Sequence, residues 1–284
     1  MHPIPSETDF KVLVEVDNAI APDFIKLVTR FKLRSKVKIS DVSEKWDVYQ
    51  VWGNGIATIV SADDLFATNS FLLRDPRTPE MGWRLLASKN AGLNIPEKVE
   101  QVAQSAYTVH RMLQGVPEGS KEINLNSSLP LESCMDYMHG VDFHKGCYIG
   151  QELTARTHFT GLVRKRILPV VLRTQPEGNN EFTVNNNASF SLPASGADVR
   201  LIAANVEEKP EKQRPTRMRS AGKFLNGVHN VGLALLRLDQ VEKTLHPATS
   251  SSVLATESMD GSPLYIRARF PTWWPSTNGT SKGD

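Results

Sequence analysis

The pattern of apolar residues along the chain changes at Gly161, and this change limits the possible folds more than any other feature. Before Gly161, strand-like apolar runs alternate with patterns of helical spacing, whereas after it the apolar runs are strand-like and separated by turn residues. Strands can only satisfy their backbone groups by pairing with other strands. The sequence therefore predicts an α+β fold that ends in a β-rich domain of barrel or sandwich type.

The expected elements follow the alternation of apolar and polar residues. A helix is predicted over 21–31, where apolar residues recur at helical spacing, and a second over 96–114, which starts with Pro96 and ends before Gly115. A type I′ hairpin turn is predicted at Asn226-Gly227. Strands are expected at 11–16, 36–42, 46–53, 82–88, 164–174, 197–203, 220–238, 251–256 and 263–270.

These elements suggest three segments along the 284 residues. Residues 1–118 are interpreted as an α+β domain, 119–160 as a turn-rich connector, and 161–284 as the β-rich domain. Near the end, Trp273 and Trp274 would be costly to leave in water. We expect this pair to dock on a neighbouring domain.

Composition excludes several classes of protein. The net charge of +2 is too small to indicate a nucleic-acid partner, and no apolar run reaches the roughly 20 residues of a membrane-spanning helix. Only two cysteines occur, Cys134 and Cys147, which is typical of a protein in a reducing compartment. Both are expected to remain thiols.

The segment around Cys147 carries the strongest chemical signal. It reads HKGCYIGQELTART, with Lys145 and Gly146 before the thiol and good helix formers from Ile149 to His158. A cysteine at a helix N-terminus beside an ammonium group has a lowered pKa, and the thiolate is both a nucleophile and a metal ligand. Gly146 and Gly150 would allow sharp turns, while Glu152 and Arg156 have the spacing of a helical ion pair.

Other interpretations of this segment remain open from the residues alone. Cys147 could be a packed, inert thiol, which is the commonest state of an intracellular cysteine. It could form a metal site with His139, His144 and His158, although their spacing matches no standard motif. A cysteine-protease site has little support, because the sequence around the thiol matches no protease signature. If the thiolate binds an iron–sulfur cluster, a partner must supply further ligands, since clusters normally take about four.

The segment KGCYIGQELTAR strongly resembles the K-G-C-[YF]-x-G-Q-E signature of the iron–sulfur assembly factors related to the glycine-cleavage T-protein. Further segments, among them RDPRTPEMGWRLL, SLPLESCMDYMHGVDF and VGLALLRL, are also similar to this family, so the resemblance covers about residues 7 to 270. The mitochondrial branch is suggested, and the PTWWP ending looks fungal in style.

The resemblance implies a T-protein-like, three-lobed, folate-binding fold that ends in a β-barrel. It also implies maturation of [4Fe–4S] proteins in the mitochondrial matrix, with aconitase and the lipoyl and biotin synthases as targets and A-type cluster carriers as partners. Tetrahydrofolate and a bridging iron–sulfur cluster are the implied ligands. The family usually has about a hundred further residues before this start, so we expect the N-terminal part of the first lobe to be missing here.

Carried over by position, the motif comprises eight residues, and Cys147 is the implied ligand of a cluster shared with a carrier. The residues are Lys145, Gly146, Cys147, Tyr148, Gly150, Gln151, Glu152 and Arg156. No catalytic residue is assigned, and a turnover enzyme is not expected. The alternative function is a tetrahydrofolate-dependent aminomethyl or one-carbon transferase, which would not need the thiol.

Overall fold

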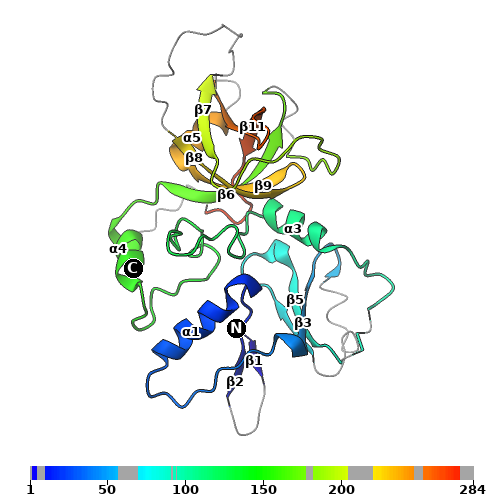
Figure 1. Cartoon of the computed structure of the whole chain (residues 1–284), viewed down its shortest axis with the longest axis vertical. Coiled ribbons are helices and arrows are strands. Elements are labelled where there is room, and N and C mark those ends of the chain that lie inside the picture. The colour runs from blue at the N-terminus through cyan, green and yellow to red at the C-terminus, as the bar shows by residue number, and fades with distance from the viewer. Residues whose placement is uncertain are drawn as a thin grey trace. The chain divides into compact units, whose positions relative to one another are not determined.

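The chain forms two compact units (Figure 1). The computed structural model describes residues 2–4, 10–56, 70–90, 92–93, 95–176, 182–203, 220–245 and 252–275. The first unit comprises Met1–Asp75 with Pro79–Gln101, and the second comprises Pro76–Thr78 with Val102–Asp284.

The first unit combines a small antiparallel sheet with a helix. Strands β3, β5 and β4 pair in that order, with Leu85 of the central strand between Tyr49 and Leu72, and β1 pairs with β2. The elements are β1 (His2–Ile4), β2 (Lys11–Leu13), α1 (Ala21–Phe31), β3 (Trp46–Val51), β4 (Ser70–Arg74) and β5 (Trp83–Ser88), with short 3₁₀ helices at Asn18–Ile20, Ser43–Lys45 and Pro79–Met81. The helix predicted over 21–31 is confirmed.

The strand predicted over 36–42 is wrong, because this run has no regular structure. Val37 keeps 53% of its surface exposed, so the alternating apolar residues of the run bury no common face. Without a neighbouring strand to accept its hydrogen bonds, a short alternating run has nothing to hold it extended.

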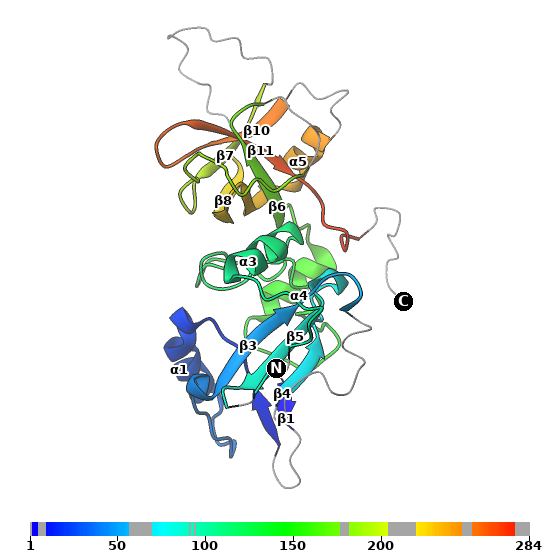
Figure 2. The ribbon, with the colours of Figure 1, turned by 90° about the vertical axis from the view of Figure 1, so that its right-hand side faces the viewer.

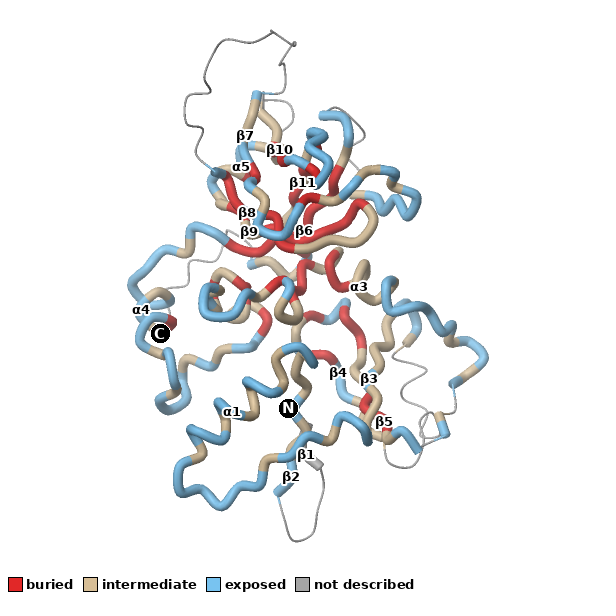
Figure 3. Tube along the Cα trace, viewed as in Figure 1, coloured by how far each residue is buried: buried red, intermediate tan, exposed pale blue. Residues whose placement is uncertain are grey.

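The second unit contains a closed six-stranded barrel, which confirms the predicted C-terminal β-barrel (Figure 2). The strands pair around the barrel in the order β10-β11-β6-β9-β8-β7, and every pair is antiparallel. Their bounds are β6 (Lys165–Arg173), β7 (Asp198–Ala203), β8 (Ser220–Val228), β9 (Val231–Arg237), β10 (Ser252–Glu257) and β11 (Pro263–Ala268), and helix α5 (Leu238–Leu245) follows β9. Inward-facing residues such as Leu168, Phe224 and Leu254 form its core, and the tube in Figure 3 is most continuously buried along β6 and β9.

The hairpin between β8 and β9 turns later than predicted. Asn226 and Gly227 lie within β8, and the turn falls at His229-Asn230, where His229 has a φ of 55°. A Cβ atom on Gly227 would lie 3.0 Å from the ring of Phe224, and one on Gly232 would lie 2.7 Å from it. These glycines therefore make room for a core side chain, a role that has no local signature.

Helix α3 (Gln104–Leu113) begins eight residues after the predicted start at Pro96. Residues 96–103 form turns and extended chain, and Val102 remains 46% exposed. The chain passes from the first unit to the second within this segment, at Gln101-Val102. The predicted end is confirmed, because Gly115 follows α3 with a φ of 70°.

The two tryptophans dock on residues that precede the barrel, but these residues belong to the same compact unit rather than to a neighbouring domain. The indole Nε1 of Trp273 donates to the carbonyl oxygen of Gln114 at 2.7 Å. The Trp274 ring lies edge-on to Tyr137, with 5.4 Å between ring centroids, and also packs against Phe270. The C-terminal segment thus ties the barrel to the chain that leads into it.

Among the described residues, no helix has the length and apolar character needed to cross a membrane.

Candidate functional site

Cys147 lies on an exposed loop that leads into helix α4 (Gln151–Thr160). The helix begins at Gln151, two residues after the predicted Ile149, so the thiol precedes the helix as expected but lies further from its first turn. Gly150 is the N-cap and has a φ of 84°, which confirms the sharp turn expected there. The chain reverses its direction between the thiol and the helix, and the sulfur is left open to solvent.

The loop is held by other residues of the motif. The backbone N–H of Tyr148 donates to Oε1 of Gln151 at 3.0 Å, and the N–H of Gln151 donates to the carbonyl of Tyr148 at 3.2 Å. The ammonium of Lys145 lies 4.9 Å from the centroid of the Tyr148 ring, a cation–π distance. Three motif residues therefore fix the backbone immediately after Cys147. The buried Tyr148 hydroxyl has no hydrogen-bond partner among the residues described.

The remaining motif residues are less constrained. Gly146 does not have a positive φ, and a Cβ atom there would meet nothing within 4 Å. Glu152 and Arg156 are exposed on α4, and within the described part of the chain no ion pair joins them, so the expected helical pair is not formed. Their side chains are thus open to other molecules.

An aromatic cluster fixes the loop to the far end of α4. The Phe143 ring stacks on the imidazole of His158, with 3.6 Å between centroids and 13° between planes, and Phe159 lies edge-on to both rings. His158 is therefore used for packing. In the described part of the chain, no group of three or more His, Cys, Asp or Glu side chains could hold a metal ion, so the suggested site of Cys147 with His139, His144 and His158 is wrong.

The connector before the loop is bound to the barrel through a buried ion pair that sequence reasoning missed. The guanidinium of Arg166, on β6, donates to both carboxylate oxygens of Asp136 at 2.7 and 2.8 Å and to the Leu131 carbonyl at 2.7 Å. It also lies 3.8 Å from the centroid of the Tyr137 ring. Although burial opposes the charge, the hydrogen bonds and attraction of Asp136 raise the pKa of Arg166 above its usual value. This pair secures the segment that leads to Cys147.

The second cysteine lies in the same anchor and is chemically unlike the first. Cys134 is fully buried, its sulfur lies 3.6 Å from the carbonyl oxygen of Ile167, and burial raises its pKa to about 12. A thiol with such a pKa is protonated at neutral pH and is a poor nucleophile or metal ligand. Only Cys147 is therefore available for chemistry.

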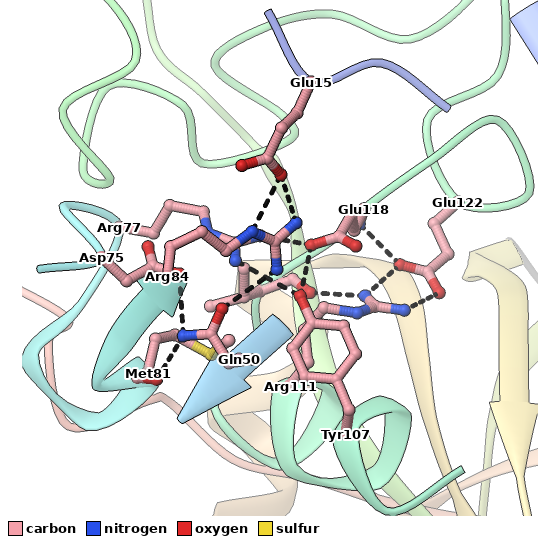
Figure 4. Close-up of polar contacts among 11 residues, drawn as sticks. Glu15, Gln50, Asp75, Arg77, Met81, Arg84, Tyr107, Arg111, Glu118 and Glu122 are labelled. Carbon is pink, nitrogen blue, oxygen red and sulfur yellow. Dashed lines mark hydrogen bonds and ion pairs between the residues drawn. The ribbon is translucent and has the colours of Figure 1, made fainter. Parts of the chain in front are cut away.

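A second buried ion pair braces α3 against the connector and the barrel (Figure 4). Arg111 donates to both carboxylate oxygens of Glu122 at 2.6 and 2.8 Å, and Glu122 also accepts from Asn226 of β8 at 3.1 Å. Their side chains are 6% and 1% exposed. A run such as RMLQGVPEGSKE does not reveal which of its charges are buried, so this pair could not be found from the sequence.

The first unit has its own polar cluster, which Figure 4 also draws. Arg84 on β5 donates through Nε to Glu15 at 2.8 Å and through Nη1 to Gln50 at 3.0 Å. Gln50 in turn donates to the carbonyl of Met81 and to Asp75. These contacts join β3, β5 and the chain around them within this unit.

The site as a whole presents one accessible thiol on a braced turn. A single thiolate can contribute one ligand to a metal or cluster, and the described residues around it supply no second ligand set. The arrangement therefore suits a thiol that acts together with groups from another molecule.

Comparisons with known proteins point to one group of relatives. A family model described as "CAF17, C-terminal beta-barrel domain" matches residues 164–276, which include all six barrel strands. The chain is 40% identical over 277 residues to "Iron-sulfur cluster assembly factor IBA57 homolog, mitochondrial" of Mycosarcoma maydis, a match that covers 93% of this chain and 66% of that protein. The homologue of Dictyostelium discoideum is 35% identical, covering 81% and 66% of the two chains. The factor of Mus musculus is 36% identical, covering 93% and 64%. The chain thus spans slightly less than two thirds of the length of these curated relatives.

Proposed function

Because this chain belongs to the IBA57 family of mitochondrial iron–sulfur cluster assembly factors, we propose that it assists the maturation of [4Fe–4S] proteins and shares a cluster with a carrier protein through Cys147. The cluster is the cargo of this process. The other ligands come from the partner, because a cluster normally takes about four.

The exposed position of Cys147 is the observation that supports this proposal most strongly. The thiol is accessible, the turn around it is held by Tyr148 and Gln151, and the connector before it is anchored by the Arg166–Asp136 pair. A braced turn limits the entropy that would be lost when the thiolate takes up a fixed place in a cluster. A labile cluster also needs a ligand that stays accessible to the partner protein, so that the cluster can be bound and then released.

The proposed partners and location follow from the family. We expect A-type carriers to supply the cluster, and [4Fe–4S] apo-proteins such as aconitase and the lipoyl and biotin synthases to receive it. The relatives carry the word mitochondrial in their names, and the mitochondrial matrix is the proposed site of action.

Tetrahydrofolate belongs to the proposal as a ligand of the T-protein-like fold. One-carbon transfer itself requires no thiol, whereas the motif places an accessible one on a supported turn. We therefore propose assembly rather than aminomethyl transfer as the function. Binding of tetrahydrofolate can be measured by quenching of tryptophan fluorescence.

The decisive experiment compares two single-thiol variants. Anaerobic reconstitution with an A-type carrier, iron and sulfide is followed by visible absorption and by iron and sulfide content per complex. We expect Cys147→Ser to lose the shared cluster and Cys134→Ala, which removes the buried thiol, to retain it. An undiminished and equally stable cluster in Cys147→Ser would remove this residue from the ligand set.

A further inference from the structure

A groove in the second unit lies beside the helix that follows the motif. It has a volume of 370 Å³ and is bounded by residues 129–132 of the connector, by α4, and by residues 162–165 at the start of β6. Leu153, Thr154 and Thr157 of α4 form one wall. The helix that begins at the end of the motif therefore also forms part of this groove.

The groove is lined by leucines that water can reach. Leu162 is 75% exposed, Leu153 is 46% exposed and Leu129 is 39% exposed. Each square ångström of apolar surface removed from water contributes roughly 25 cal/mol. Three partly exposed leucines around one concavity therefore favour the binding of an apolar side chain.

The polar lining of the groove is mainly cationic. Lys165 on β6 and Arg237 on β9 are directly paired across the two strands, and Arg164 stands beside them. Like charges in this relation repel each other. Arg237 is balanced by Asp239, at 3.3 Å, but no ion pair is formed by Arg164 or Lys165 among the residues that the structure describes.

Acidic residues contribute little to the groove. Glu132 is the one carboxylate in its lining, and no ion pair involves its side chain in the described residues. Because Asp239 balances Arg237, two cations, Arg164 and Lys165, stand against this one carboxylate, and the net positive charge favours an occupant with negative charge.

We propose that this groove docks a polypeptide segment of the cluster carrier in which a large apolar side chain stands next to carboxylates. This inference rests on the function proposed above, because it takes the docked protein to be the one that shares its cluster with Cys147. The apolar side chain would enter between Leu129, Leu153 and Leu162, and the carboxylates would pair with Arg164 and Lys165. Docking beside α4 would hold the carrier close to the loop without using the cluster itself.

The test measures binding of an apo A-type carrier, without cluster, to the full chain by isothermal titration calorimetry at several NaCl concentrations. Leu153→Ala should weaken the Kd roughly ten-fold, as expected for a central interface anchor. The double variant Arg164→Glu/Lys165→Glu should weaken it further and remove most of its dependence on salt. All these side chains are at the surface, so the variants should keep the thermal stability of the parent.

Matched controls lie outside the groove. Leu125→Ala removes a leucine that is 56% exposed, somewhat more than Leu153, and Lys121→Glu/Arg200→Glu reverses two exposed charges elsewhere. Both controls should leave the Kd within about two-fold, because isolated surface changes have small effects. Equal Kd values for groove variants and controls, or no binding of the apo carrier to the parent chain, would overturn the docking proposal.

Two further outcomes separate this proposal from its alternatives. If the groove variants change the sedimentation of the chain alone but not its Kd for the carrier, the occupant is a second copy of the chain and the proposal is wrong. Cys147→Ser should bind the apo carrier normally while it loses the shared cluster. If it keeps the cluster while the groove variants still weaken binding, the ligand role of Cys147 fails and the docking site stands.

Discussion

The anchor between Arg166 and Asp136 offers the sharpest test of how the site is supported. In Asp136→Asn the side chain keeps its shape but loses the charge that balances the guanidinium, which is only 4% exposed. Arg166 would keep its hydrogen bond to the carbonyl of Leu131 and its cation–π contact with the ring of Tyr137, but neither group carries a compensating charge. Removing one partner of a buried pair typically costs about 3–5 kcal/mol.

The matched control is Asp198→Asn. Asp198 also pairs with a cation, Lys223, at 2.9 Å, but its side chain is 42% exposed. Water and salt screen such a pair, so its loss should cost less than about 1 kcal/mol. The same chemical change is thus predicted to have several-fold different effects at the two positions.

Urea unfolding and calorimetry provide the measurement. For a unit of this size, a loss of about 3–5 kcal/mol lowers the Tm by about 6 to 20 °C. The double variant Asp136→Leu/Arg166→Met, which removes both charges, should recover much of this loss. Equal destabilisation by Asp136→Asn and Asp198→Asn would refute the argument that burial decides the energy of the anchor.

Three further predictions concern the thiols and the turn. Iodoacetamide at neutral pH should modify Cys147 in the folded protein and Cys134 only after unfolding, as followed by mass spectrometry, because one sulfur is exposed and the other buried. Gly150→Ala should lower the stability by about 1 kcal/mol in urea unfolding because of its φ of 84°, while Gly146→Ala, with open space around it, should not. Burial raises the pKa of Cys134 from 9.0 to about 12, so between these values the unfolded chain binds fewer protons and stability falls as the pH rises, by up to about 1.4 kcal/mol per pH unit. Cys134→Ala should lack this part of the alkaline loss, and an identical pH dependence in the variant would contradict the assignment.

Local sequence patterns predicted the structure correctly where contacts between residues close in the chain determine it. The alternation of apolar residues predicted the barrel strands, since side chains of a strand must face inward at every second position. The helix over 21–31 followed from its apolar spacing, and the turn at Gly150 from the freedom of glycine. The motif also drew attention to Cys147, although its neighbouring residues alone did not exclude a packed, inert thiol, which is the commoner state.

Distant contacts decided what the patterns could not. The turn of the β8–β9 hairpin moved to His229-Asn230 because Gly227 serves the packing of Phe224, and α3 begins only at Gln104, after the chain has crossed between the two units at Gln101-Val102. The partners of Arg166 and Arg111 lie 30 and 11 positions away from them in the chain, and no local rule selects them from the many charges nearby.

The two cysteines show most directly which properties the sequence determines and which depend on the tertiary structure. The sequence by itself determined that the chain has two thiols, that one lies in a glycine-flanked motif before a helix, and that a strand-rich domain follows. Only the tertiary structure decided that Cys147 is exposed while Cys134 is enclosed next to Arg166 and β6. Exposure depends on which segments pack together across the whole fold, and the reactivity of a thiol follows from its exposure and its charge environment.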